Sequence, residues 1–228
     1  MVRVLAVLGL TLSALVLPSS AVSDALGTAT CGGLVVTIDL NDPGAPDPNR
    51  DESDVVLGTP GDDDIFAGNG ADTVCGGAGD DLIWLRGESP TDELQAAYGG
   101  PGDDYFNSSP DDELFHGGGG KDTVAFSFPC RECGTEYPDP QVGVTVDLRL
   151  TEPQDTGGRG TDELSGIENL KGSGDEDVLL GDGENNRLDG FFGDDTINGR
   201  RGADFLRGGD GTDRCIGGPG RDHLERCE

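Results

Sequence analysis

The sequence predicts an all-β protein, a solenoid in which short parallel strands stack into two facing sheets. Three observations support this: a repeat of nine residues, 40 glycines among 228 residues, and 45 acidic against 15 basic residues, for a net charge of −30. Glycine and aspartate in such numbers favour turns over helices. The charge makes nucleic acid a poor partner and cations good ones, so no nucleic-acid binding is expected.

The first 25 residues have the layout of a secretory signal peptide. Arg3 precedes an uncharged apolar run from Val4 to Leu17, and small residues follow it. We expect cleavage between residues 21 and 25, and hence a secreted, extracellular protein. The run is too short for a comfortable membrane span and no second one follows, so no span is expected. Residues 26–48 are expected to form an N-terminal cap segment.

Tandem nonapeptides make up most of the remaining chain. A first block, residues 49–125, contains GTPGDDDIF, AGNGADTVC and GGAGDDLIW without a gap, and the period resumes at Gly99 after one enlarged half-turn. A second block, residues 163–228, contains six consecutive copies from Gly172 and ends in a C-terminal cap. Residues 126–162 break the period and are expected to form an insert or linker, either an enlarged coil without a role or a binding loop.

Three positions of the repeat define its structure. Across fourteen copies, position four is Gly in ten, position six is Asp in eleven, and position eight is apolar in all. Glycines allow a tight turn, and positions seven to nine supply a three-residue strand whose middle side chain points inward. One inward residue per nine cannot bury a face alone. Successive strands must therefore stack in parallel, with two nonapeptides in each turn of a right-handed coil.

The position-six carboxylates of copies one coil apart should lie close together along both edges. Two carboxylates about 4 Å apart repel by up to ~4 kcal/mol at an effective dielectric of 20, and a cation between them reverses the sign. Carboxylate and carbonyl oxygens favour Ca²⁺ over zinc or copper, so we expect roughly five to ten calcium ions. The predicted bridging pairs are Asp63 with Asp81, Asp81 with Asp104, Asp104 with Asp122, Asp177 with Asp195, Asp195 with Asp213, and Asp204 with Asp222.

The full predicted ligand set has two parts. The carboxylate ligands are Asp63, Asp72, Asp81, Asp104, Asp122, Asp177, Asp195, Asp204, Asp213 and Asp222. The backbone carbonyl ligands are those of Gly58, Gly61, Gly76, Gly79, Gly99, Gly102, Gly190, Gly193, Gly199, Gly202, Gly208 and Gly211. Sites that touch Glu113, Glu184 or Asn186 should be weak or empty. The position-five acids Asp62, Asp80, Asp103 and Asp194 should cap turns rather than bind metal.

These repeats resemble the hemolysin-type calcium-binding nonapeptide of RTX proteins. The copies GGAGDDLIW, GGPGDDYFN and GGDGTDRCI are similar to its GGxGxDxUx unit. GVTVDLR and GTDELSGIENLKGS are similar to linkers between RTX blocks. The resemblance implies a parallel β-roll, calcium held by position-six aspartates and loop carbonyls, and folding outside the cell when calcium is met. In contrast to many RTX toxins, we expect an N-terminal signal here and no enzymatic or pore-forming passenger.

Six cysteines follow the signal segment, which suggests disulfide bonds in an exported chain. Of fifteen possible connectivities, we expect Cys130 with Cys133 in the insert, Cys215 with Cys227 as a C-terminal clasp, and Cys31 with Cys75 by elimination. Zinc at Cys130 and Cys133 is the less favoured alternative, because the chain has no second CxxC.

No recognisable catalytic constellation is present. HExxH, GxSxG and Walker motifs are missing, and both histidines, His116 and His223, fall at outward strand positions of the repeat. We therefore expect a calcium-binding protein that is not an enzyme. The alternatives are a β-helical extracellular polysaccharide-modifying enzyme and a surface or matrix adhesin. A protein or polysaccharide partner is not identified by the sequence. Arg200, Arg201, Arg207, Arg214 and Arg221 form a basic patch that either neutralises neighbouring aspartates or contacts an acidic polymer.

Overall fold

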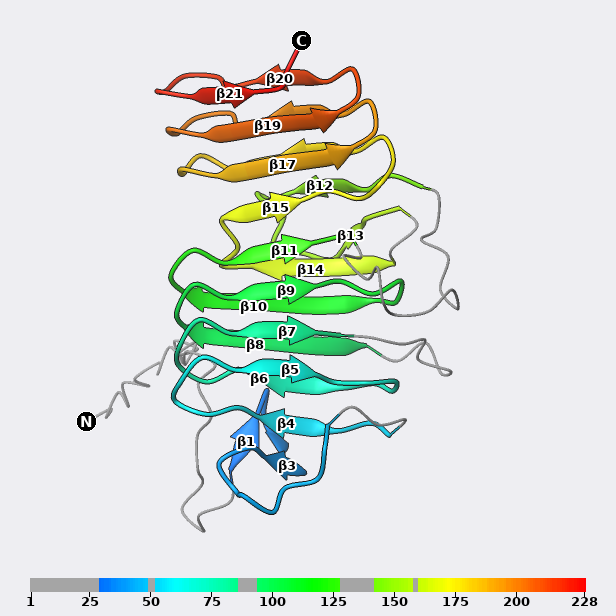
Figure 1. The fold of residues 1–228 in the computed structure, drawn as a ribbon, viewed down its shortest axis with the longest axis vertical. Coiled ribbons are helices and arrows are strands. Elements are labelled where there is room, and N and C mark those ends of the chain that lie inside the picture. Colours follow the sequence, from blue (N-terminus) through cyan, green and yellow to red (C-terminus); the bar gives the residue numbers. More distant parts are fainter. Residues whose placement is uncertain (1–28, 49–51, 86–93, 128–141, 158–159) are drawn as a thin grey trace, which may run out of the picture.

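A computed structural model describes residues 29–48, 52–85, 94–127, 142–157 and 160–228. The described residues form strands and turns without a helix, and the strands stack along one axis as a parallel β-roll (Figure 1). Among them, no helix is long and apolar enough to cross a membrane. The predicted signal segment and the Cys130–Cys133 pair lie outside the described residues.

Two long faces make up the roll. One face is an eight-stranded sheet in the order β21 (His223–Glu225), β19 (Phe205–Asp210), β17 (Arg187–Phe192), β15 (Asn169–Lys171), β11 (Thr123–Ala125), β9 (Tyr105–Asn107), β7 (Leu82–Trp84), β5 (Asp64–Phe66).

The other face consists of two sheets. Its seven-stranded part has the order β13 (Gln154–Asp155), β14 (Thr161–Ser165), β10 (Glu113–Gly119), β8 (Gln95–Pro101), β6 (Thr73–Cys75), β4 (Val55–Leu57), β3 (Ile38–Asp39). Its four-stranded part has the order β12 (Thr145–Asp147), β16 (Val178–Leu180), β18 (Thr196–Asn198), β20 (Arg214–Ile216). A short antiparallel pair, β1 (Thr30–Cys31) and β2 (Leu34–Val35), lies at the N-terminal end.

The register confirms two repeats per coil. Val56 pairs with Val74 and Ile65 with Ile83, each eighteen positions further on. The coil also continues across the long stretch after Leu85, since Val74 pairs with Ala97 and Ile83 with Phe106. The chain therefore makes the expected enlarged half-turn there.

Position eight forms the core. Twelve of the fourteen predicted inward residues are 0–1% exposed: Val56, Ile65, Val74, Ile83, Phe106, Phe115, Val124, Leu170, Leu179, Leu188, Ile197 and Leu206. Cys215 is partly buried and Leu224 is 45% exposed, because the last coil has no further coil stacked on it. The pattern is confirmed except at this end.

Irregular segments fill the remaining core positions. Ala97 and Val146 are buried where the nonapeptide pattern gives no copy, and Leu164 is buried at position two of the copy that begins at Glu163. Leu164 reaches its place through pairing of β14 with β10, at a separation of 49 residues from Phe115. Val146 belongs to β12, so part of the predicted insert is built into the stack beside β16.

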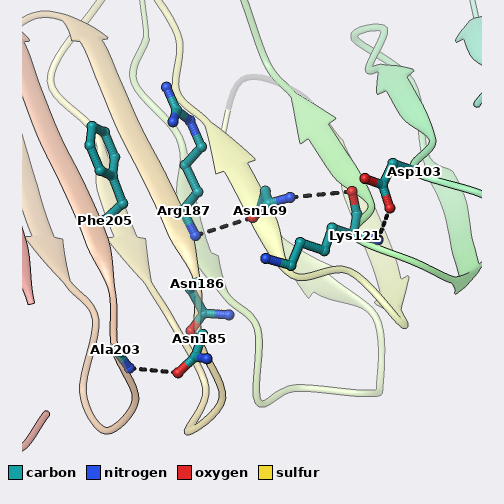
Figure 2. A pocket seen from close by; sticks show the side chains of 8 residues that line it. All are labelled: Asp103, Lys121, Asn169, Asn185, Asn186, Arg187, Ala203 and Phe205. Atoms are coloured by element: carbon teal, nitrogen blue, oxygen red, sulfur yellow. Dashed lines mark hydrogen bonds between the residues drawn. The ribbon is translucent and has the colours of Figure 1, made fainter. Parts of the chain in front are cut away.

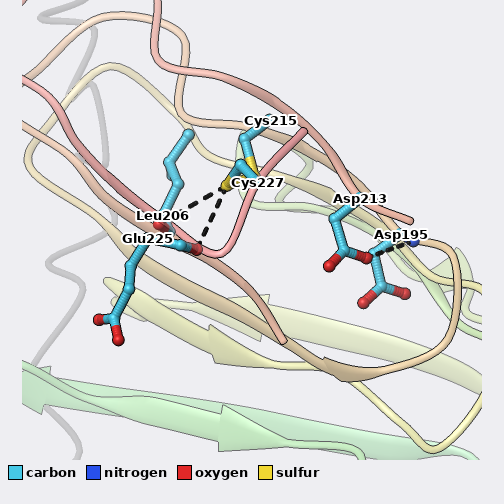
Figure 3. The surroundings of a disulfide bond; sticks show 6 residues. All are labelled: Asp195, Leu206, Asp213, Cys215, Glu225 and Cys227. Atoms are coloured by element: carbon cyan, nitrogen blue, oxygen red, sulfur yellow. Dashed lines mark hydrogen bonds between the residues drawn. A yellow bond between two sulfur atoms is a disulfide. The ribbon is translucent and has the colours of Figure 1, made fainter. Parts of the chain in front are cut away.

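Two of the three expected disulfides are present in the described residues. Cys31–Cys75 ties the N-terminal segment to β6, with the two Cα atoms 5.7 Å apart. Cys215–Cys227 closes the C-terminal end at 5.6 Å, in the region that also contains the Asp195 and Asp213 pair (Figure 3).

Candidate metal centres

The position-six side chains form a hydrogen-bonded ladder along each edge of the roll. In each step, one carboxylate oxygen, Oδ1, accepts the backbone N–H of the position-six residue one coil earlier. Asp63 donates to Asp81 at 2.9 Å, and Asp81 donates to Asp104 at 2.9 Å. The other Asp-to-Asp steps are Asp54 to Asp72, Asp104 to Asp122, Asp177 to Asp195, Asp195 to Asp213 and Asp204 to Asp222. All six pairs predicted from the sequence are thus neighbours.

The second oxygen of these carboxylates is the unusual atom. The Oδ2 atoms of Asp81, Asp104, Asp122, Asp195 and Asp204 are buried and accept no hydrogen bond. Leaving a buried acceptor without a partner costs about 1–3 kcal/mol, and more for a charged group. Because the same oxygen lacks a partner at the same repeat position in five turns, we expect one kind of bound group to contact all five.

Each orphaned oxygen lies against a position-one glycine, and at Gly76, Gly99, Gly117 and Gly190 a backbone carbonyl oxygen lies beside it. A Cβ built on Gly99 would collide with Asp104 Oδ2 and lie 2.7 Å from the Gly117 carbonyl oxygen. A Cβ on Gly190 would collide with Asp195 Oδ2 and lie 2.7 Å from the Gly208 oxygen. A carboxylate and a carbonyl oxygen therefore lie on the same side of a glycine that leaves space for them. This donor set fits a hard divalent cation.

Two classes of turn differ in the residue at position two. In the open class this residue has a positive φ, as in Gly77 (120°), Gly100 (120°), Phe191 (79°) and Arg200 (71°), and the carboxylate of its turn keeps an orphaned Oδ2. The turns of Asp81, Asp104, Asp122, Asp195 and Asp204 combine both features and are called open below. A positive φ at position two also occurs at Gly68, Gly209 and Gly218, in the turns of Asp72, Asp213 and Asp222.

In the closed class, the position-two N–H donates a hydrogen bond to the position-six side chain of its own turn. Thr59 donates to Asp63 Oδ2 at 2.6 Å, and Ser173 donates to Asp177 Oδ2 at 2.7 Å. Ser109 donates in the same way to Glu113, and Asp182 to Asn186. Asp63 and Asp177, both predicted ligands, therefore lie in the ladder with their oxygens already hydrogen-bonded.

The other predicted ligands lie where the repeat places them. Asp72 and Asp213 are buried in the ladder, and Asp222 is half-buried in the last coil. Among the position-one carbonyls, those of Gly76, Gly99, Gly190, Gly199 and Gly208 face the position-one glycine of the preceding coil, whereas Gly58 accepts Asn41 Nδ2 at 3.0 Å. Among the position-four residues, Gly61, Gly79, Gly102, Gly193 and Gly202 lie against the position-four glycine of the next coil, and Gly211 lies against Gly193.

The position-five acids cap turns, as expected. Asp62 Oδ1 accepts the N–H of Asp80, and Asp80 Oδ1 accepts that of Asp103, at 2.9 and 2.8 Å. Asp103 and Asp194 do the same for Lys121 and Thr212. This second ladder runs opposite to the position-six ladder and lies at the exposed rim.

Burial sets the electrostatics of the position-six ladder. It raises the pKa of Asp81, Asp122 and Asp195 to about 7, against the lowering effect of the backbone N–H each accepts, and neighbouring carboxylates raise it further. Burial also raises the pKa of Asp177, to about 6, and that of Asp104 and Asp204. Without a cation, the ionised ladder is therefore unfavourable at neutral pH.

The ladder is interrupted where acids are replaced. Asn186 Nδ2 donates to the Glu168 carbonyl oxygen at 2.9 Å, so an amide joins two coils there. On the other edge, buried Gln95 and Glu113 occupy position six, followed by Asp162. Gln95 and Asp162 were missed from the sequence. The buried Ala97 and Leu164, two residues after each of them, are the signal that could have identified them.

An arginine joins the insert to the second block. Arg200 Nη1 and Nη2 donate to the two carboxylate oxygens of Asp147 at 2.6 and 2.8 Å, and Nη1 also donates to the Gly181 carbonyl oxygen. The pair lowers the pKa of Asp147 well below its usual range. The Arg200 guanidinium, a cation, thus binds the carbonyl of a position-one residue, Gly181, and the carboxylate of Asp147. For Arg200, the neutralising interpretation of the basic patch is therefore correct.

No group of three or more His, Cys, Asp or Glu side chains that could hold a metal lies within the described ranges. A cation on the ladder would thus need carbonyl oxygens beside one or two carboxylates.

The model of the RTX calcium-binding nonapeptide repeat, which describes four copies of the unit, matches residues 50–83, 97–124, 164–190, 171–206 and 189–224. These segments cover more than half of the chain, and the chain belongs to this family. Its repeats are calcium-binding repeats, arranged in a β-roll. No curated protein matches the chain.

Proposed function

We propose that this protein is secreted and folds on calcium outside the cell, with its ions held at the five open turns of Asp81, Asp104, Asp122, Asp195 and Asp204. The observation that carries the proposal is the set of buried Oδ2 atoms without a hydrogen-bond partner, each beside a position-one glycine. A divalent cation offsets the repulsion within the ladder and supplies the missing partner.

The compartment follows from the chemistry of the ligands. Extracellular calcium modules bind at roughly 10⁻⁴ to 10⁻³ M, far above cytosolic calcium, so such a ladder would stay empty until export. The signal-like N-terminus and the disulfides Cys31–Cys75 and Cys215–Cys227 support the same compartment.

The role is binding rather than catalysis. The one His–Ser contact in the described residues, His116 Nδ1 to Ser165 Oγ at 2.8 Å, joins paired positions of β10 and β14. Ser165 Oγ also donates to the Phe115 carbonyl oxygen, so this hydroxyl is held in the strand pairing.

Calcium titration followed by circular dichroism, with ions counted by equilibrium dialysis, tests the proposal. Asp195→Asn should remove one ion and raise the calcium midpoint about tenfold or more, because it removes a ligand charge. Asp194→Asn is the matched control: it makes the same charge change one residue away, at an exposed capping position. A β spectrum that persists in chelator at pH 8, or equal effects of both variants, would contradict the proposal.

A further inference from the structure

Two adjoining hollows lie on the outer face of the eight-stranded sheet, beside one edge of the roll. The first, of about 430 Å³, lies over β7 and β9 and is lined by Trp84, Tyr105 and Asn107 among others. The second, of about 350 Å³, extends over β15, β17 and β19 (Figure 2). Asp103 lines both, so together they follow the roll axis.

The first hollow contains aromatic surface and unpaired polar atoms. The Trp84 indole stacks on Phe66 with ring centroids 5.4 Å apart. Phe66 belongs to β5, so the indole's other side is toward β9 and the hollow. Trp84 Nε1 and both amide atoms of Asn107 are buried without a hydrogen-bond partner, and Asn107 is only 2% exposed. Such orphaned groups in a hollow point to a polar ligand.

The second hollow is lined by two cationic side chains. Lys121 and Arg187 line it, and neither makes an ion pair with a described residue in this strongly acidic protein. The Arg187 guanidinium carbon lies 4.4 Å from the centroid of the Phe205 ring. Figure 2 shows Asn169 between Arg187 and Lys121, and Asn185 beside Ala203.

The spacing of these residues suits an extended ligand. Trp84 on β7 and Phe205 on β19 are separated by five strand-to-strand steps through β9, β11, β15 and β17. At about 4.8 Å per step, the rings are roughly 24 Å apart along the roll axis. A ligand that contacts both must be a chain rather than a single small molecule.

We propose that these two hollows form one binding groove for an uncharged oligosaccharide that lies along the roll axis. Sugar rings present C–H faces to aromatic rings, and their hydroxyls both donate and accept hydrogen bonds. The lining contains carboxylates, cations and amides, which together suit hydroxyl groups better than a single charge. The net charge of −30 opposes a polyanionic chain.

The groove goes beyond calcium binding but depends on the folded roll. Asp81 lines the first hollow and also belongs to the position-six ladder. Oligosaccharide binding should therefore be measured on the calcium-loaded protein, with circular dichroism as a separate check of folding. A failure of calcium-driven folding is then distinguishable from a failure of the groove.

Trp84 provides the readout, because it is the protein's single tryptophan. A panel of neutral and uronate oligosaccharides should show a neutral member that shifts the Trp84 fluorescence and binds in calorimetry. Trp84→Ala and, independently, Arg187→Ala should weaken that binding about tenfold or more. Phe192→Ala, which removes an aromatic ring that is 45% exposed and outside both hollows, should leave it unchanged.

Three results would overturn the groove. They are no binding of any neutral oligosaccharide by the folded, calcium-loaded protein, binding of uronate chains alone, or equal loss of binding in Phe192→Ala and Arg187→Ala. Arg187 is exposed, so its variant keeps the test valid even where Trp84→Ala does not fold.

Discussion

At the residue scale, the glycines of position one are as specific as the aspartates. A glycine at this position leaves room for the Oδ2 atom of its own turn and for the carbonyl of the next coil, as at Gly190 with Asp195 and Gly208. Any side chain would occupy the volume in which these two oxygens meet. At the five open turns position one is therefore glycine for reasons of space, whereas Ala67 and Ser108 occupy it in the copies of Asp72 and Glu113.

Gly190→Ala should abolish the ion at Asp195 and destabilise the calcium-loaded protein by about 1–3 kcal/mol, because the new methyl group displaces the carboxylate. Dialysis and thermal unfolding would measure both effects. Gly183→Ala is the control, since a Cβ there meets nothing within 4 Å and the backbone φ is not positive. Equal loss of calcium in both variants would show that the contact at Gly190 is unimportant.

At the scale of the element, the turn decides which repeats can bind and the strand merely holds them in register. The closed turns of Asp63 and Asp177 carry the same position-six aspartate as the open ones. They differ in the backbone at position two. The N–H groups of Thr59 and Ser173 donate to the carboxylate, whereas Gly77 and Gly100 have a positive φ and the carboxylates of their turns keep an unpaired Oδ2. In the proposed scheme, a position-two N–H that donates to the carboxylate of its own turn thus makes a repeat silent.

Ser173→Gly should add one bound calcium ion, because glycine permits the positive φ of an open turn and releases Asp177 Oδ2. Ser173→Ala is the matched comparison. It removes the hydroxyl that donates to Asp177 Oδ1 at 2.8 Å, but alanine keeps the preference of serine for a negative φ. Ion counting by dialysis should show the gain in the glycine variant alone. A gain in both variants would assign the effect to the hydroxyl instead.

At the scale of the whole molecule, a continuous apolar core stabilises the roll, and repulsion within the ionised position-six ladder destabilises it. The core runs from Ile38 to Leu206 through both faces of the roll. Arg200 with Asp147, and Asn41 with the Gly58 carbonyl, satisfy groups at the junction and at the N-terminal end without metal. We expect these places to need calcium least.

Acidification should weaken calcium binding and stabilise the metal-free folded state. Burial raises the pKa of Asp81, Asp122 and Asp195 to about 7 in the folded protein, from an ordinary value of 3.8. The metal-free folded state therefore binds more protons between these values, and its stability falls as pH rises from about 4 to 7. Protons and calcium compete for the same carboxylates, so the calcium midpoint should rise as pH falls from 8 to 6. Titrations followed by circular dichroism at pH 8, 7 and 6 would test this, and a constant midpoint would contradict it.

The sequence by itself determined the strands, their parallel stacking and the pairing of aspartates one coil apart. A period of nine with one inward residue per repeat has a single way to bury its apolar surface, and that stacking brings Asp63 to Asp81 and Asp195 to Asp213. The tertiary structure alone decided which turns are open, how Leu164 and Val146 fill the core, and where Arg200 pairs with Asp147. These features depend on one backbone angle and on contacts between residues 33 to 53 positions apart, which a local repeat does not encode.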